Sequence, residues 1–409
     1  MHPSLLAILI FVITLGTYAA TMPMSITLED AGLFQMVCYQ GGLAHPPGYP
    51  LFTLACRALV VSPEIMNGNL VSALFGAFTV VVFFFLLLSI IRSSVVAMSA
   101  ALAYAFTATF WAQSIIIEVY SLAAFLLFLC WYALDRFVQH KREVDWFLAC
   151  LVFGLALSNH WPLAMLSAPA LLAVIWPEVR SLLFKLTNSR FFLLTVLLFV
   201  LGLTPYFYLV TRPDDVFGVF GPINTFSEFV DYVSRSSYND DKAGATIADK
   251  LAFLSWLPLE TIRQIGFPLS LLAAVGLYYS FKTAPRHQAI AFLLNYLGGT
   301  FLLTLLLGFK FDQHGQSIFM PYPIIAYGSL AIWLAYGLMA ISSMHHSLTN
   351  KVVQAAFGLF IVLTIALTNL PTNNRSKDSW IEAYFTLLLQ SLPKDAVLFA
   401  EGDVLFFPI

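Results

Sequence analysis

The stretch from Gly68 to Ile91 reads GNLVSALFGAFTVVVFFFLLLSII and contains no charged side chain. A helix needs about 20 apolar residues to cross the roughly 30 Å hydrocarbon core of a bilayer. Comparable apolar runs recur along the chain, and they do not alternate between apolar and polar residues as the strands of a membrane barrel do. The sequence therefore predicts an all-α integral membrane protein.

The composition agrees with this prediction. Hydrophobic residues make up 60% of the 409 residues, and charged residues only 10%. A soluble globular domain carries about 25% charged residues, so this chain has too few charges to cover a water-exposed surface of its size. The composition excludes an ordinary soluble protein.

We expect about eleven transmembrane helices, at residues 4–22, 68–91, 95–112, 115–134, 146–159, 162–177, 191–211, 265–281, 288–309, 317–341 and 352–370. A shorter apolar stretch at 50–61 is too short to cross, so we expect it to be interfacial or re-entrant. The first run lacks the basic n-region of a signal peptide, and we interpret it as a retained helix. Residues 1–370 then form one transmembrane domain, and 371–409 a non-cytoplasmic C-terminal segment that is a truncated or small soluble region.

The charges of the short loops predict the orientation. If the N-terminus is cytoplasmic, every short loop on the cytoplasmic side is rich in basic residues, as the positive-inside rule requires. These loops contain Arg92, Arg136, Lys141, Arg142, Arg180, Lys185, Arg190, Lys282, Arg286 and Lys351. Three long segments, at about 22–67, 212–263 and 371–409, are then non-cytoplasmic, and the unusual polar residues of the chain concentrate in or beside them.

The first long segment contains TLEDAGLF (Thr27–Phe34) and HPPGYP (His45–Pro50). Its prolines and Gly48 favour a fixed, non-helical shape at the membrane surface. Asp30 and His45 beside such a loop could act in general base catalysis or in cation binding. The alternative is a solvated loop acid and a histidine that caps a turn, and the residues alone leave both interpretations open.

Other polar residues lie at the outer ends of the expected helices. Glu118 lies between two apolar runs, where an acid is costly and therefore suggests a function, although it could simply reach water from a helix end. Arg212 could recognise a phosphate group through its guanidinium, or its side chain could instead extend to the membrane interface. The further candidates at these positions are Asn159, His160, Asn224, Arg235, Tyr238, Lys310 and His314. Each of them could also be an ordinary connector or loop residue.

Several signals of other functions are missing from the sequence. There is no P-loop, no H-E-x-x-H zinc motif and no G-x-S-x-G nucleophile elbow. The helix interiors carry little charge, whereas transporters often bury polar groups near the midplane. The four cysteines, Cys38, Cys56, Cys130 and Cys150, show no C-x-x-C pair, and we expect them to be free thiols that pack as small hydrophobic residues.

These motifs resemble a family of multi-pass membrane proteins that includes a eukaryotic protein O-mannosyltransferase, within the glycosyltransferase C superfamily. The similarity is strong over residues 20–165 and weaker near 212–238 and 393–403. Besides TLEDAGLF and HPPGYP, it is carried by NGNLVSALFG (Asn67–Gly76), FWAQSIIIEVYSL (Phe110–Leu122) and GLALSNH (Gly154–His160). Where the family has Trp, Ser and a second acid, this chain has Glu29, Ala31 and Leu33, so Asp30 is the only acid of that motif carried over.

The resemblance implies an all-α glycosyltransferase of C-type architecture with a long first outer loop. Such enzymes use an acid in that loop to deprotonate an acceptor hydroxyl, which displaces a lipid phosphate from a sugar with inversion. The resemblance assigns this role to Asp30. Residues expected to bind substrate are His45, Tyr49, Glu118, Tyr120, Asn159, His160, Arg212 and His314.

The expected donor is a polyprenyl-phosphate hexose, with mannose as the expected sugar, and the acceptor is a protein or glycan. The remaining expected partners are membrane lipids, without nucleic acid. No metal or other cofactor is expected, although Glu29 or Glu118 could complete a cation site with Asp30. The expected location is a bacterial inner membrane, with the active site on the non-cytoplasmic face. A flippase, a transporter or a binding protein for a lipid-linked sugar is the alternative.

Overall fold

The structure is a computed structural model that describes residues 2–28, 30–211, 220–236, 245–306, 308–344 and 349–399. Every regular element within these ranges is helical, which confirms the all-α prediction. By length and composition, eight described helices could cross a membrane, or up to ten if each of two bent helix pairs counts as one span. The protein is a multi-pass membrane protein. This count takes residues 143–186 as one span, whereas the prediction of about eleven counts 146–159 and 162–177 separately.

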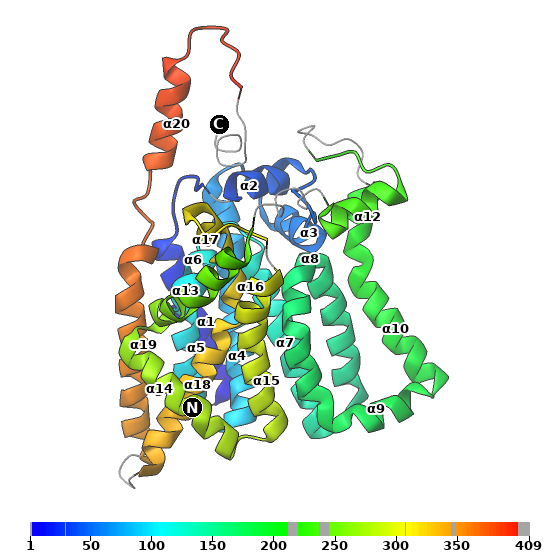
Figure 1. Cartoon of the computed structure of the whole chain (residues 1–409), viewed down its shortest axis with the longest axis vertical. Helices are drawn as coiled ribbons and strands as arrows, with labels where there is room; N and C mark the ends of the chain where they lie inside the picture. Colours follow the sequence, from blue (N-terminus) through cyan, green and yellow to red (C-terminus); the bar gives the residue numbers. More distant parts are fainter. Residues whose placement is uncertain are drawn as a thin grey trace.

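The long helices form an upright bundle (Figure 1). The helices that lie in the eight spans are α1 (Pro3–Thr21), α4 (Ile65–Ile91), α7 (Tyr120–His140), α8 (Glu143–Ile175), α9 (Val179–Leu186), α10 (Ser189–Leu203), α11 (Phe207–Thr211), α15 (Arg286–Leu297), α16 (Leu303–Leu306), α18 (Tyr327–Met344) and α19 (Lys351–Asn373). The bent pairs are α5 (Ser94–Ala105) with α6 (Ala108–Ser114), at 68°, and α13 (Ile247–Ile265) with α14 (Phe267–Thr283), at 104°. The remaining α-helices are α2 (Ala31–Gln40), α3 (Pro50–Leu59), α12 (Phe226–Ser234), α17 (Gln313–Phe319) and α20 (Trp380–Ser391).

Helix α8 consists of two halves that run in opposite directions. His160 breaks it with a non-helical backbone conformation, φ −150° and ψ 82°. A straight helix of this length would extend about 50 Å. Yet Glu178, just beyond its end, pairs with Lys141, just before its start. The second half of α8 therefore runs back to the end of the bundle at which the first half begins. His160 lies at the turn, between the expected spans 146–159 and 162–177.

Glycines permit close approach between neighbouring helices. A Cβ atom on Gly154 of α8 would lie 2.4 Å from the backbone oxygen of Phe199 in α10. A Cβ atom on Gly276 of α14 would likewise overlap the backbone of Trp333 in α18. Small residues are favoured where membrane helices pack, because apolar burial alone does not drive association in lipid. These contacts fix α10 against α8, and α18 against α14.

The first long segment folds over one end of the bundle as α2 and α3, with α12 beside them (Figure 1). The stretch expected to be interfacial or re-entrant forms the ten-residue helix α3. A disulfide joins Cys38 of α2 to Cys56 of α3, so the prediction of four free thiols is wrong for this pair. Cys130 and Cys150 are free. The disulfide ties the two short helices together directly beside the turn that carries His45.

The same end of the bundle carries the C-terminal part of the chain. Helix α19 ends at Asn373, and α20 extends away from the bundle (Figure 1). The connection is anchored by a hydrogen bond from the Arg375 backbone N–H to the Thr21 carbonyl oxygen, 2.8 Å. The proposed division at residue 370 stays a prediction, and residues 400–409 lie outside the described part of the chain.

Candidate active site

An acid–imidazole pair occupies the end of the bundle covered by α2 and α3. Asp30 precedes the first residue of α2, and His45 lies in the turn before α3. The Nε2 atom of His45 is 3.0 Å from Oδ2 of Asp30, and its Nδ1 atom is 3.1 Å from the Pro46 carbonyl oxygen. Because both ring nitrogens face hydrogen-bond acceptors, the geometry favours the doubly protonated imidazolium.

The environment favours the charged form of both partners. Burial opposes ionisation of Asp30, but the charge and hydrogen bond of His45, with a further contribution from Arg235, hold the pKa of Asp30 below its usual value. Burial also opposes protonation of His45, but the Asp30 carboxylate and the Pro46 carbonyl raise the pKa of His45. The side chain of Asp30 remains 34% exposed, compared with 9% for His45. The environment therefore favours an ionised carboxylate beside a protonated imidazole, and the carboxylate is still accessible.

The local sequence explains why His45 is held in place. Gly48 has φ +88°, a conformation that other residues rarely adopt, and a Cβ atom there would lie 2.8 Å from Leu209. The Tyr208 hydroxyl donates to the Gly42 carbonyl oxygen, 3.0 Å, and the Tyr232 hydroxyl donates to that of Ala44. The predicted fixed shape of HPPGYP is thus provided by its own backbone together with α11 and α12.

Three tyrosines surround His160 at the turn of α8. The ring centroids of Tyr49, Tyr120 and Tyr322 lie 5.4, 5.6 and 5.8 Å from that of His160. The Nδ1 atom of His160 accepts a hydrogen bond from the Leu163 backbone N–H, so the proton resides on Nε2. Nε2 has no hydrogen-bond partner among the described residues, although His160 is only 1% exposed. A buried donor of this kind is suited to bind an oxygen atom of a ligand.

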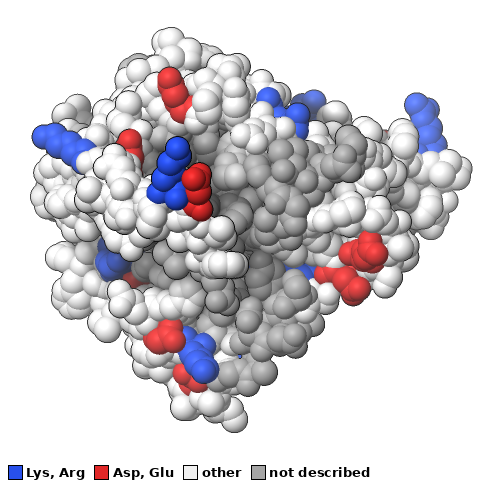
Figure 2. All heavy atoms as spheres, turned by 90° about the horizontal axis from the view of Figure 1, so that it is seen from above, with Lys and Arg blue, Asp and Glu red and all other residues white. Residues whose placement is uncertain are grey.

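Arg235 connects the tyrosines to the acid–imidazole pair. It follows the last residue of α12 with φ 62°, and its Nη1 atom donates to the Tyr322 hydroxyl, 3.4 Å. Its charge also acts on Asp30 and His45. We call Asp30, His45, Tyr49, Tyr120, His160, Arg235 and Tyr322 the acid–aromatic cluster. Figure 2, viewed from this end, shows charged residues scattered over the described surface.

Glu118 and Asn159 lie beside the cluster and hold backbone in place. Glu118 is 2% exposed, and its carboxylate accepts a hydrogen bond from the Val119 backbone N–H, 3.3 Å, while the Ser72 hydroxyl bonds to the backbone N–H and carbonyl oxygen of Glu118. The Asn159 side-chain amide donates to the Val119 carbonyl oxygen, 3.2 Å. These contacts fix the non-helical residues that precede α7 and therefore position Tyr120.

The remaining predicted site residues lie either outside the described ranges or on the surface. Arg212, Tyr238 and Glu29 lie outside the described residues, so their predicted roles stay untested. His314 is exposed on α17. The described ranges hold no group of three or more His, Cys, Asp or Glu side chains that could bind a metal ion.

Sequence reasoning missed one member of the cluster and undervalued another. Tyr322 falls inside the expected span 317–341, where a tyrosine is taken for a membrane-facing residue; the flanking Pro321 and Pro323 are the signal that could have marked a break. In the structure α18 begins only at Tyr327. Arg235 was one of several polar residues of the second long segment, and nothing in its neighbourhood distinguished it.

Comparison with known proteins gives the same assignment as the motifs. Residues 30–181 match a family described as the Protein O-mannosyl-transferase TMEM260 N-terminal domain, a range that includes Asp30, His45 and His160. Protein O-mannosyl-transferase TMEM260 of Mus musculus is 23% identical over 97% of this chain and 59% of its own length. Protein O-mannosyl-transferase tmem260 of Dictyostelium discoideum is 24% identical over 67% of this chain and 36% of its own length.

The chain thus spans between about one third and three fifths of the length of these relatives. The matched family region ends before Arg235 and Tyr322. It supplies the acid–imidazole pair and most of the aromatic rings. The family resemblance found in the motifs is confirmed: residues 30–181 match the TMEM260 N-terminal-domain family, and the chain is a distant relative of the mouse and Dictyostelium protein O-mannosyl-transferases.

Proposed function

We propose that this chain is a membrane glycosyltransferase of C-type architecture that transfers mannose from a polyprenyl-phosphate donor to an acceptor hydroxyl on the non-cytoplasmic side. The observation that carries the proposal is the Asp30–His45 pair, 3.0 Å apart, next to an arginine and a ring of tyrosines. The relatives' names supply the sugar and the class of acceptor, a protein.

The reaction is a single inverting displacement. The acceptor oxygen forms a bond to the anomeric carbon while the bond between that carbon and the phosphate oxygen breaks, and its electron pair leaves with the phosphate. The acceptor proton passes to the Asp30 carboxylate. The acceptor hydroxyl becomes strongly acidic as its bond to carbon forms, so a carboxylate with a lowered pKa can accept this proton. His45 keeps that carboxylate ionised and oriented.

The leaving group needs positive charge. A phosphodiester becomes a monoester, which carries more negative charge, and preorganised donors at that position lower the barrier. Arg235 supplies the charge, and the Nε2–H group of His160 supplies a buried donor. Tyr120 is partly exposed and offers an aromatic face against which a hexose ring can pack, whereas Tyr49 is buried behind it against His160. In this proposal Asn159 and Glu118 position the tyrosine platform, and His45 positions the base.

Two observations support the proposed orientation. Disulfides persist in oxidising compartments, and the Cys38–Cys56 disulfide lies at the same end of the bundle as the acid–aromatic cluster. The basic short loops, such as the one that contains Lys141 and Arg142, belong to the opposite end. Both observations, the disulfide and the basic loops, agree with an acid–aromatic cluster that faces the non-cytoplasmic side.

The test is release of radiolabelled mannose from polyprenyl-phosphate-mannose by purified protein in nanodiscs, with and without acceptor peptide. Asp30→Asn removes the base and is expected to lower release by about 10²- to 10⁴-fold. Asp378→Asn is the matched control, because Asp378 forms a surface ion pair with nearby Arg375 at the same end. Equal release by wild type and Asp30→Asn would remove Asp30 as the base. Binding of the donor without any release would favour the flippase or binding-protein alternative.

A further inference from the structure

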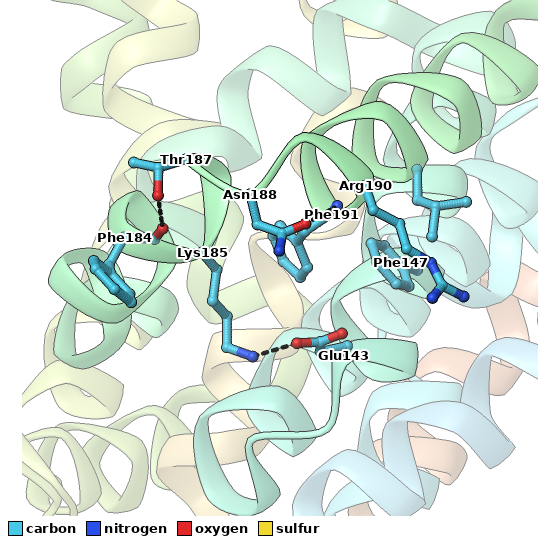
Figure 3. A pocket seen from close by; sticks show the side chains of 9 residues that line it. Glu143, Phe147, Phe184, Lys185, Thr187, Asn188, Arg190 and Phe191 are labelled. Atoms are coloured by element: carbon cyan, nitrogen blue, oxygen red, sulfur yellow. Dashed lines mark hydrogen bonds and ion pairs between the residues drawn. The ribbon is translucent and has the colours of Figure 1, made fainter.

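A hollow of about 640 Å³ lies at the end of the bundle opposite the acid–aromatic cluster. Figure 3 shows it between the first turns of α8, helix α9 and the start of α10. It is lined by Glu143, Phe147, Phe184, Lys185, Thr187, Asn188, Arg190, Phe191 and Leu194. The proposed mannose transfer uses none of these residues, so this hollow requires its own explanation.

The lining combines two cations with an apolar wall. Lys185 is held by an ion pair with Glu143, and its Nζ atom lies 5.5 Å from the centroid of the Phe191 ring. Arg190 makes no ion pair within the described ranges of the chain, so its guanidinium is available to an anion. Phe147 and Phe191 pack with their ring centroids 5.2 Å apart, and they form the apolar wall. With Glu143 offsetting one of the two cations, the lining keeps a net positive charge.

The position of the hollow matches the headgroup region of a bilayer. Helices α8 and α10 belong to candidate membrane spans, and the hollow lies where they begin or end. Helix α9 exposes large apolar side chains, with Leu183 60% and Phe184 79% exposed, and the nearby Trp176 is 73% exposed. Aromatic and leucine side chains on a short helix between spans are typical of the membrane interface.

We propose that this hollow binds one anionic phospholipid of the adjoining leaflet. Arg190 and Lys185 would bind its phosphodiester, and Phe147, Phe191 and Leu194 would contact the start of an acyl chain. The N-terminal end of α10, where Asn188 caps the helix, adds partial positive charge on the same side. A free phosphate ion would leave the apolar wall unfilled, and a zwitterionic headgroup would bring its own cation to a lining that is already positive.

Native mass spectrometry of the full chain released from detergent tests this inference. The probes are phosphatidylglycerol and phosphatidylcholine with identical acyl chains, and soluble glycerol phosphate. Phosphatidylglycerol is expected to bind wild type more tightly than phosphatidylcholine does. Arg190→Gln is expected to weaken its binding by about tenfold, because it removes a hydrogen bond to a charged group. Arg180→Gln is the matched control, since Arg180 lies on α9 but does not line the hollow.

Each outcome decides for or against the proposal. Loss of phosphatidylglycerol selectivity in Arg190→Gln, with selectivity retained in Arg180→Gln, supports a built lipid site. Equal loss in both variants means that general surface charge attracts the lipid, and overturns it. Equal binding of phosphatidylcholine, or equally tight binding of glycerol phosphate, also overturns it. The thermal midpoint of each variant without added lipid shows whether it is folded, and Lys185→Gln gives a second variant of the same site.

Discussion

In the acid–aromatic cluster the charged residues are enclosed and act on one another, whereas at the end that carries α9 the Lys141–Glu178 and Lys185–Glu143 ion pairs each have one partner that is open to solvent. His45 is buried against Asp30, and Arg235 acts on both. At the other end, the side chains of Lys141 and Glu143 are 53% and 51% exposed in their ion pairs. Enclosed charges interact strongly, while exposed pairs contribute about 0–1 kcal/mol.

Charged residues therefore have two different roles in the molecule. Around Asp30, desolvated charges are tolerated because each has a fixed partner, and such arrangements concentrate at functional sites. Around Lys141, charges lie where water can solvate them, and they mark the end of the apolar core. If this division is right, substitutions in the acid–aromatic cluster change activity or stability strongly, and substitutions in the ion pairs around Lys141 change little.

After that of Asp30→Asn, the largest expected effect is loss of transfer in Arg235→Gln. Removing one preorganised group that stabilises developing charge lowers kcat by about 10²- to 10³-fold. Because Arg235 also acts on Asp30, we expect the fall to appear mainly in kcat rather than in KM. Steady-state assays of mannose release measure both. Arg375→Gln, a charge loss at the same end but within a surface pair with Asp378, is the control. Equal activity in the two variants would mean that Arg235 has no part in the reaction.

The helices could be predicted from the sequence because each one satisfies its backbone hydrogen bonds internally, so its signal lies within one apolar run. The site was only partly predictable. Asp30, His45, Tyr49, Tyr120 and His160 are near recognisable motifs, and the structure brings them together. Their functional roles stay predictions.

The rest depends on contacts that no local pattern encodes. Tyr322 lies in a break before α18, but the hydropathy of the sequence indicates a continuous helix there. Arg235 contacts Tyr322 although the two residues are 87 positions apart in the chain. The Cys38–Cys56 disulfide has no motif, because α2 and α3 bring the two sulfurs together only after the loop has folded. The turn of α8 at His160 was predicted in part: two apolar runs indicated it, and the Lys141–Glu178 and Lys185–Glu143 pairs establish its direction.

The second prediction concerns this disulfide. Cys38→Ser opens a loop with a sequence separation of 18 residues, for which chain entropy predicts a loss of about 3 kcal/mol. The thermal midpoint should fall by several degrees, while Cys150→Ser, which removes a free thiol, should change it less. Maleimide labelling under denaturing conditions checks the pairing: wild type should label two cysteines without reductant and four with it. Labelling of all four without reductant would contradict the disulfide.

The third prediction is a pH dependence of stability. The raised pKa of His45 means that its stabilisation is complete below about pH 6.5 and is lost as the pH rises through the raised value. The lowered pKa of Asp30 means that its stabilisation is complete above about pH 4 and is lost on acidification. The pair is therefore strongest between these limits.

The thermal midpoints of wild type and His45→Gln should differ most near pH 6, and the difference should shrink toward pH 9 as the wild-type imidazolium loses its proton. His314→Gln, which alters an exposed residue, should show little change in this difference. A gap between wild type and His45→Gln that widens with rising pH would mean that His45 is neutral in the folded protein.

The smallest effect is expected at the opposite end, in the Lys141–Glu178 pair, whose lysine is 53% and whose glutamate is 15% exposed. Lys141→Gln should lower stability by about 0–1 kcal/mol, because the exposed ammonium group is already well solvated and gains little from the pair. Lys141→Glu should lower it further by placing two acids together, and adding Glu178→Lys should restore it. Restoration, measured as thermal midpoints at low salt, requires residue 141 to lie beside residue 178, and therefore requires α8 to turn back at His160. If the double variant is no more stable than Lys141→Glu alone, the two ends of α8 are not neighbours, and the placement of His160 beside the tyrosines loses its support.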